Sequence, residues 1–244
     1  AHPNSALLLV NGREILFLPK QDPADALWHG ESPSNLNIAK SLGFEDVMAL
    51  EDLEARVSAY ESLHSLAVSD PFTNQRLSKI HGKDFSFGKN HGSQKLVDAT
   101  IQMRRILQSE EIQSMLEAAK ITGNAHVAAM MSTKIGRHER DVAFAFHQKI
   151  AKAHLPTAYD SIVTVDGHIL HNHHQRNTMA DGQLLLLDGG AESAAGYATD
   201  VTRTWPVSGR FTAQQKVAYE AVLRANQESI QMVQKGVRYR DIHT

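Results

Sequence analysis

The chain of 244 residues has no cysteine, which excludes a disulfide framework and a zinc site built from thiolates. We take the cytoplasm as its expected location, because a chain without cysteine fits a reducing compartment. No apolar run approaches the roughly 18 residues that span a bilayer. The formal net charge of -2 provides no positive field for a nucleic acid. The sequence therefore predicts no membrane segment and no nucleic-acid partner.

The hydrophobic share of 42% is sufficient for a sizeable core, in one large domain or two modest ones. A change of pattern near Arg104 and Arg105 indicates a domain boundary at about residue 107. We expect an N-terminal α/β domain over residues 1–107, incomplete at its start, and a second domain over residues 108–244, incomplete at its end.

The N-terminal domain is expected to begin with a β-hairpin. Residues 5–10 and 13–18 are apolar runs around Asn11 and Gly12, which tolerate the positive φ angles of a type I′ turn. Two segments with helical spacing follow, and then one that mixes strand-like pieces with turns. The helical segments are residues 36–42 and 52–63, and the mixed segment is residues 65–92.

The second domain is expected to open with two helices. Ser109, followed by Glu110 and Glu111, should cap a helix that runs to about Ser132, because its hydroxyl can accept from free N–H groups and the acids suit the helix dipole. Another amphipathic helix is expected over residues 139–153. The apolar stripe of the first helix is Ile112, Leu116, Ala119, Val127 and Met130, and the inward residues of the second are Val142, Phe146 and Ile150.

Strands and a last helix complete the expected α+β arrangement. Thr212 and Gln215 form a capping box that opens a helix ending near Lys235, with Gly236 as its stop. The predicted strands are residues 161–165, 184–187 and 197–205.

Two carboxylates lie on the last two predicted strands. Asp188 ends a strongly apolar strand, where an ionised side chain is costly unless it is compensated. With a turn centred on Ala194, Asp188 would pair directly with Asp200, and their Cβ atoms would be about 5 Å apart. Two such charges either raise a pKa or hold a cation. In the alternative reading, Asp188 caps a turn and Asp200 pairs with Arg203 or another base.

Five short motifs resemble the aminopeptidase P and prolidase branch of the pita-bread metallopeptidases. The resemblance covers about residues 96–240, and the first hundred residues match the N-terminal domain of that family more loosely. It implies an α+β pita-bread catalytic domain of the creatinase and aminopeptidase type, N-terminal half only, after a small α/β domain. The motifs are LLLLDGGAE at 184–192, GYATDVTRTWPVSGRFT at 196–212, ILHNHH at 169–174, the Asp181-Gly182 turn and SEEI at 109–112.

The resemblance also implies roles for three residues. Asp188 resembles the ligand that chelates one metal, and Asp200 resembles the ligand that bridges two. The cofactors implied are two divalent ions, manganese first, with zinc or cobalt as alternatives, and they would activate a bridging water to hydroxide. His171 resembles the active-site histidine that contacts the substrate and stabilises the tetrahedral intermediate without binding metal.

Neighbouring residues have weaker assignments. His173 and His174 are expected to face solvent or to lie behind the site, although His171 and His173 would share a face of one extended strand and a His-rich tract can bind metal. Tyr197 and Arg203 are expected to serve packing and ion pairing.

The sequence departs from the family pattern in two ways. Full members carry a later His and two Glu ligands, and no residue after Lys235 matches them. We therefore expect a fragment that is inactive alone, a protein whose missing half is a separate chain, or a degenerate relative. The twelve-residue separation of Asp188 and Asp200 is one longer than the family spacing, which a bulge or a longer turn would absorb.

The function that follows is an Xaa-Pro aminopeptidase acting on peptides that contain proline, as a homodimer or higher oligomer. The alternatives are an Xaa-Pro dipeptidase (prolidase), a creatinase-like hydrolase, and a non-catalytic binding or scaffold protein on the same fold. The N-terminal domain favours this branch over the methionine aminopeptidases, which resemble only the catalytic domain.

Overall fold

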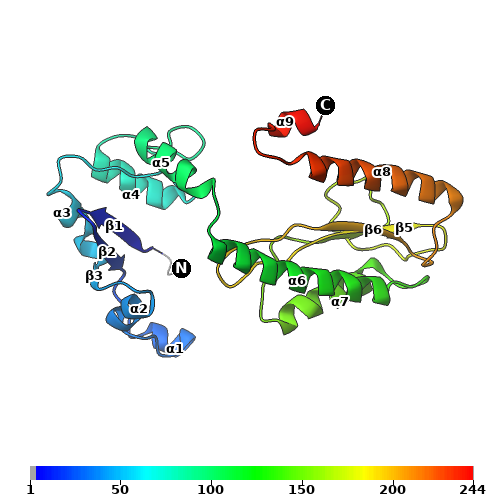
Figure 1. Cartoon of the computed structure of the whole chain (residues 1–244). Coiled ribbons are helices and arrows are strands. Elements are labelled where there is room, and N and C mark those ends of the chain that lie inside the picture. The colour runs from blue at the N-terminus through cyan, green and yellow to red at the C-terminus, as the bar shows by residue number, and fades with distance from the viewer. Residues whose placement is uncertain (1–3, 244) are drawn as a thin grey trace. The chain divides into compact units, whose positions relative to one another are not determined.

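The computed structural model describes residues 4–243. The chain divides into two compact units, Ala1–Ile106 and Leu107–Thr244, and each is described by itself (Figure 1). None of the helices in the described residues is both long and apolar enough to cross a bilayer.

The first unit has a small mixed sheet. Strands β1 (Ala6–Val10) and β2 (Arg13–Leu18) are antiparallel, and β3 (Asp46–Ala49) is parallel to β2. Asn11 and Gly12 have φ angles of 50° and 74°, which confirms the predicted type I′ hairpin.

The helices of the first unit differ in part from the prediction. The prediction of strand-like pieces and turns over residues 65–92 is wrong. The segment contains an 11-residue helix that begins at Pro71 and is capped by the Asp70 side chain. The helix expected to reach residue 63 ends at Val57. The elements are α1 (Asp25–His29), α2 (Asn35–Ser41), the 3-10 helix η1 (Leu50–Asp52), α3 (Leu53–Val57), α4 (Pro71–His81) and α5 (Gln94–Arg104).

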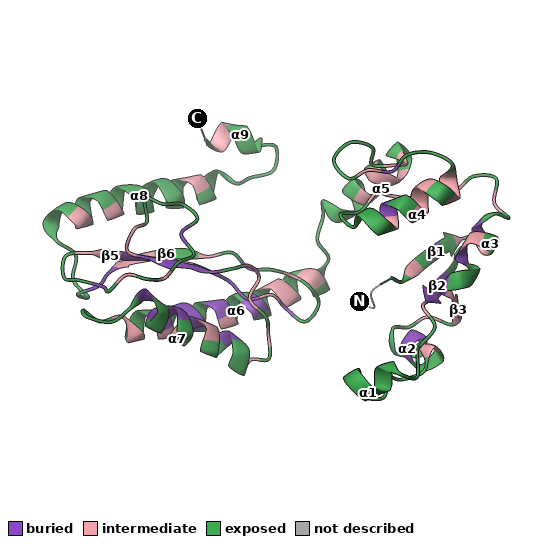
Figure 2. Cartoon of the chain, turned by 180° about the vertical axis from the view of Figure 1, so that it is seen from behind, coloured by how far each residue is buried: buried purple, intermediate pink, exposed green. Residues whose placement is uncertain are grey.

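The second unit has an antiparallel sheet with strand order β4-β5-β6. Helices α6 and α7 lie along one side of this sheet, and α8 runs on the other (Figures 1 and 2). The predicted α+β class is confirmed. The strands are β4 (Ile162–Thr164), β5 (Leu184–Asp188) and β6 (Thr202–Pro206), and the helices are α6 (Ser109–Ser132), α7 (Glu139–Lys152), α8 (Ala213–Met232) and α9 (Tyr239–Ile242).

The caps of these helices are partly as expected. The α6 cap is Gln108 rather than Ser109, because the Glu111 side chain accepts from the Gln108 N–H in a capping box. The predicted capping box of Thr212 and Gln215 opens α8, which ends at Met232, three residues before the predicted end.

The core of the second unit lies between the sheet and the two helices α6 and α7. The predicted inward residues of α7 are buried, with Phe146 fully so. The predicted apolar stripe of α6 is on the wrong face: Leu116 is 59% exposed, and Ile112, Val127 and Met130 are exposed as well. The residues that α6 buries are instead Ala118, Thr122, Ala125, His126 and Ala129. Figure 2 shows buried stretches, in purple, along α6.

Candidate metal centre

The pairing of β5 with β6 decides how the two aspartates meet. The direct pairing of Asp188 with Asp200 is wrong, since Asp188 lies opposite Thr202. The same register continues to Glu192 opposite Ala198, which places Gly190 opposite Asp200. Asp200 is two residues before Thr202, so it lies on the face of Asp188 as its diagonal neighbour.

The turn explains the shift. The Gly196 N–H donates to the Ser193 carbonyl at 2.9 Å, and Gly196 has a φ angle of 81°. Such a three-residue loop, a type I turn followed by a left-handed residue, is centred on Ala195 and not on Ala194. Moving the centre by one residue moves each cross-strand partner by two, and this preserves the face on which a side chain lies.

The two carboxylates converge on one hydroxyl. The Tyr159 Oη atom lies 2.6 Å from Asp188 Oδ1 and 2.9 Å from Asp200 Oδ1. Burial first, and then both carboxylates, raise the pKa of Tyr159, so the phenol keeps its proton. The sequence analysis missed Tyr159, and the available signal was its place directly before the strand at 161–165.

The charges at this position fit a cation. None of the ion pairs among residues 4–243 involves Asp188 or Asp200. The Arg203 guanidinium donates instead to the Thr202 carbonyl at 2.7 Å, so the alternative pairing of Arg203 with Asp200 is not formed. Two carboxylates with a single hydroxyl proton between them are a suitable donor set for a hard divalent ion.

The described part of the chain holds no group of three or more His, Asp or Glu residues arranged for a metal. The centre visible here therefore consists of two carboxylates and the hydroxyl between them.

The histidine segment is not a strand. His171, His173 and His174 lie in the connection between β4 and β5, and all three are exposed. The rings of His171 and His173 are 6.4 Å apart. His173 lines a polar hollow of about 400 Å³ together with His147 and Asp160. No hydrogen bond between His171 and either aspartate is found among the described residues.

A buried carboxylate anchors this segment. Glu139, the first residue of α7, is fully buried. Its Oε1 atom accepts from the Val165 N–H at 2.8 Å and from Asn177 Nδ2 at 2.9 Å, and its Oε2 atom accepts from the Asn177 N–H at 3.0 Å. The buried Asn172 side chain donates to Thr164 Oγ1 at 3.1 Å. The ends and the middle of the segment are therefore held in place.

Helices α6 and α7 each bring one imidazole into contact with residues next to the strands. His126 Nε2 contacts the Gly189 carbonyl at 3.2 Å, and His147 Nε2 contacts Ser161 Oγ at 3.2 Å. Burial lowers the pKa of both histidines, so both rings are neutral near pH 7. Tyr197, expected to serve packing and ion pairing, donates its hydroxyl to Glu111 Oε1.

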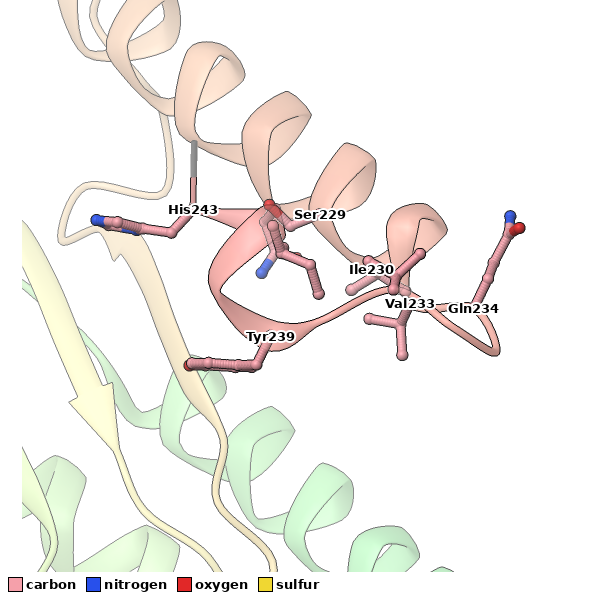
Figure 3. A pocket seen from close by; sticks show the side chains of 9 residues that line it. Ser229, Ile230, Val233, Gln234, Tyr239 and His243 are labelled. Atoms are coloured by element: carbon pink, nitrogen blue, oxygen red, sulfur yellow. The ribbon is translucent and has the colours of Figure 1, made fainter.

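A separate hollow of about 530 Å³ lies where the end of α8 faces α9 (Figure 3). It has no carboxylate, so it offers no donor set of the kind that Asp188 and Asp200 form. Its lining residues are Asn226, Ser229, Ile230, Val233, Gln234, Val237, Tyr239, Ile242 and His243.

Two solved structures with the same fold are aminopeptidases. The aminopeptidase PepP of Pseudomonas aeruginosa superposes with a TM-score of 0.84 at 24% identity, over 99% of this chain and 58% of that chain. A zinc-substituted Escherichia coli aminopeptidase P in complex with product gives a TM-score of 0.82 at 23% identity, over 99% of this chain and 58% of that chain.

Curated relatives agree with the structures. Xaa-Pro aminopeptidase 3 of Homo sapiens is 28% identical over 249 residues, covering 97% of this chain and 48% of that protein. A probable Xaa-Pro aminopeptidase of Podospora anserina is 28% identical over 238 residues, covering 96% of this chain and 51% of that protein. The chain spans about half the length of these relatives.

Two family descriptions match the chain, one in each unit. Residues 1–67 match the aminopeptidase P N-terminal domain. Residues 113–244, more than half of the chain, match the metallopeptidase family M24. The match begins within α6 and includes both aspartates. The chain therefore belongs to metallopeptidase family M24, with an aminopeptidase P N-terminal domain before the family's catalytic region.

Proposed function

We propose that this chain supplies Asp188 and Asp200 to a centre of two divalent cations in a peptidase of the Xaa-Pro aminopeptidase type. The observation that carries the proposal is the convergence of both carboxylates on the Tyr159 hydroxyl. The relatives named above are Xaa-Pro aminopeptidases, which supports cleavage next to proline and favours an aminopeptidase over a dipeptidase.

Divalent cations held there would lower the pKa of water and polarise a carbonyl oxygen. Asp188 would bind one ion and Asp200 would bridge both. Tyr159 would keep its proton and orient the two carboxylates. We propose manganese as the ion, with zinc or cobalt as alternatives, because carboxylate oxygens suit hard cations. Since no third ligand is grouped with this pair in residues 4–243, further ligands must come from another segment or another chain.

His171 would contact the substrate. Its ring is exposed, in a segment that Glu139 anchors. A neutral or protonated imidazole can donate to the oxygen of the scissile carbonyl as negative charge develops on it. His171 is therefore assigned to the substrate and not to the metal.

The test uses the intact protein, manganese or zinc, and the substitutions Asp188→Asn and Asp200→Asn. We expect both variants to lose metal affinity and Xaa-Pro hydrolysis by more than the roughly 10–100-fold that loss of an outer hydrogen-bond partner costs. Asp181→Asn is the control, since Asp181 is an exposed turn residue before the other end of β5.

Hydrolysis that survives Asp200→Asn would overturn the assignment. Comparison of Xaa-Pro dipeptides with longer Xaa-Pro peptides separates a dipeptidase from an aminopeptidase. Peptide binding by the wild type without any hydrolysis would instead indicate a scaffold protein.

A further inference from the structure

The hairpin backbone between the two aspartates is held in part by side chains of α6. In an antiparallel pair of strands, every second pair of opposite residues normally exchanges two backbone hydrogen bonds. At the first such position, the Gly189 N–H donates to the Val201 carbonyl at 3.1 Å. The Gly189 carbonyl accepts from His126 Nε2 at 3.2 Å.

The next hydrogen-bonded pair of the hairpin, Ala191 and Thr199, shows the same pattern. Its helix contact is Thr122, which lies one turn before His126 in α6. The Thr199 N–H donates to the Ala191 carbonyl at 3.0 Å. The Ala191 N–H donates to the hydroxyls of Thr122 at 2.9 Å and Thr199 at 3.1 Å, and these two hydroxyls lie 2.6 Å apart. A helix side chain thus enters each of the two pairs that flank Gly190 and Asp200.

Ser114 of α6 and Thr133, the residue that caps the C-terminal end of α6, meet the hairpin differently. Ser114 donates to the Ser193 hydroxyl at 2.8 Å, and Trp205 Nε1 donates to the Thr133 hydroxyl at 3.0 Å. These are contacts between side chains. Thr122 and His126 contact the hairpin backbone itself, within three residues of Asp188.

Both side chains are buried, and the burial of His126 is costly. Thr122 is 0% exposed and His126 is 3% exposed. His126 Nδ1 is buried without a hydrogen-bond partner, which is unfavourable for a polar atom. An apolar side chain of similar size would avoid that cost but could not donate to Gly189. The imidazole therefore contributes the hydrogen bond to the Gly189 carbonyl, which an apolar side chain cannot form.

The backbone opposite Asp200 is closely packed. A Cβ atom on Gly190 would lie 1.7 Å from the Thr199 carbonyl oxygen, so the two strands approach closely opposite Asp200. A small shift of residues 189–191 would therefore change the position of Asp200 relative to Asp188.

We propose that Thr122 and His126 are positioning residues that hold the backbone of residues 189–191 so that Asp188 and Asp200 meet at the distance a metal pair requires. This inference rests on the proposed metal-binding role of the two aspartates.

The test measures Mn²⁺ affinity of the intact protein by calorimetry, with the Mn²⁺ electron paramagnetic resonance signal as a second readout. Thr122→Val and His126→Met remove the hydrogen bonds at similar size, and we expect the dissociation constant to rise by about 10–100-fold. Thr122→Ser and His126→Gln retain the hydroxyl or a donor at the Nε2 position and should restore affinity to near the wild-type value. Thr133→Val is the matched control at the end of the same helix, and it should leave affinity unchanged.

The outcomes separate the two proposals. If the wild type binds Mn²⁺, Asp200→Asn does not, and both Thr122→Val and His126→Met bind as tightly as the wild type, this inference alone is overturned. If the wild type binds no Mn²⁺, the proposed function fails and this inference fails with it. Equal weakening by Thr133→Val would show a general structural effect and would also overturn it. If Thr122→Val does not fold, the comparison of His126→Met with His126→Gln decides.

Discussion

The helices α6 and α7 pack against each other and against the same sheet, yet they bury different chemistry. After its first turn, α7 buries Val142, Ala143, Phe146 and Ile150, all apolar. In α6 the buried residues are three alanines, a threonine and a histidine, whereas most of its larger apolar side chains are exposed. The small alanines allow close approach, and the polar side chains reach the hairpin that carries the aspartates. Beyond its first turn α7 contributes mainly apolar packing, whereas the buried face of α6 also supplies hydrogen bonds to the hairpin.

The strongest test of this comparison is Phe146→Ala on the α7 side. The ring is 0% exposed and makes edge contacts with the rings of His126 and His147. Its removal leaves a cavity, so we expect the free energy of unfolding to fall by about 3–5 kcal/mol in urea denaturation. Phe144→Ala is the matched control on the same helix, where the side chain is 67% exposed. Equal losses for the two variants would contradict the assignment of the core face.

An intermediate effect is expected from pH, because α6 carries the buried His126 and α7 the half-buried His147. Burial lowers the pKa of His126 and His147 below the value of about 6.5 in the unfolded chain. The unfolded state then binds protons more readily, so the free energy of unfolding should fall as the pH drops through about 6.5, with no contribution well above that pH. Denaturation at about pH 8 and about pH 5.5 measures the slope. His126→Gln and His147→Gln should each reduce it, and an unchanged slope in both would refute the prediction.

A smaller and opposite effect is expected on the exposed side of α6. A Cβ atom on Gly123 would meet no atom within 4 Å. Because glycine in a helix interior is less favourable than alanine, Gly123→Ala should stabilise the protein by up to about 1 kcal/mol, seen as a higher thermal midpoint. A loss of stability would mean that a side chain at position 123 meets neighbouring atoms.

The smallest effect is expected from Leu116→Ser on the exposed apolar stripe of α6. Leu116 is 59% exposed, so the change should alter the free energy of unfolding by less than about 0.5 kcal/mol. A loss several times larger in the intact protein would show that another chain or segment covers this stripe. Helix α6 would then bury two faces, and its contrast with α7 would no longer hold.

The sequence predicted the shared face of Asp188 and Asp200 but not their register, and their role as metal ligands stays a prediction. Alternation along the strands was enough to place Asp188 and Asp200 on one face. The register could not be predicted, because it depends on whether Gly196 or its neighbour takes the left-handed conformation. Tyr159 was missed because its contacts lie 29 and 41 residues away along the chain. The role of His171 stays a prediction.

The prediction of which helix face is buried was limited in the same way, by contacts that are distant along the chain. The apolar rule succeeded for α7, where burial of hydrocarbon decides the face. It failed for α6, because the hydrogen bonds of Thr122 and His126 to the hairpin are long-range and leave no periodic apolar signal. The helix α4 was within reach of sequence analysis, since Asp70 followed by Pro71 is a recognised helix start.

Gly190 has a consequence for how this sequence can vary over evolution. At Gly189, a new methyl group would meet the Phe146 ring at 2.8 Å, and repacking of that ring offers compensation by a second mutation. At Gly190 the obstacle is the Thr199 carbonyl oxygen, a main-chain atom that every amino acid at position 199 would carry. No substitution at position 199 can therefore compensate for a side chain at position 190. In a random library selected for folding, position 190 should retain glycine while position 189 drifts together with position 146.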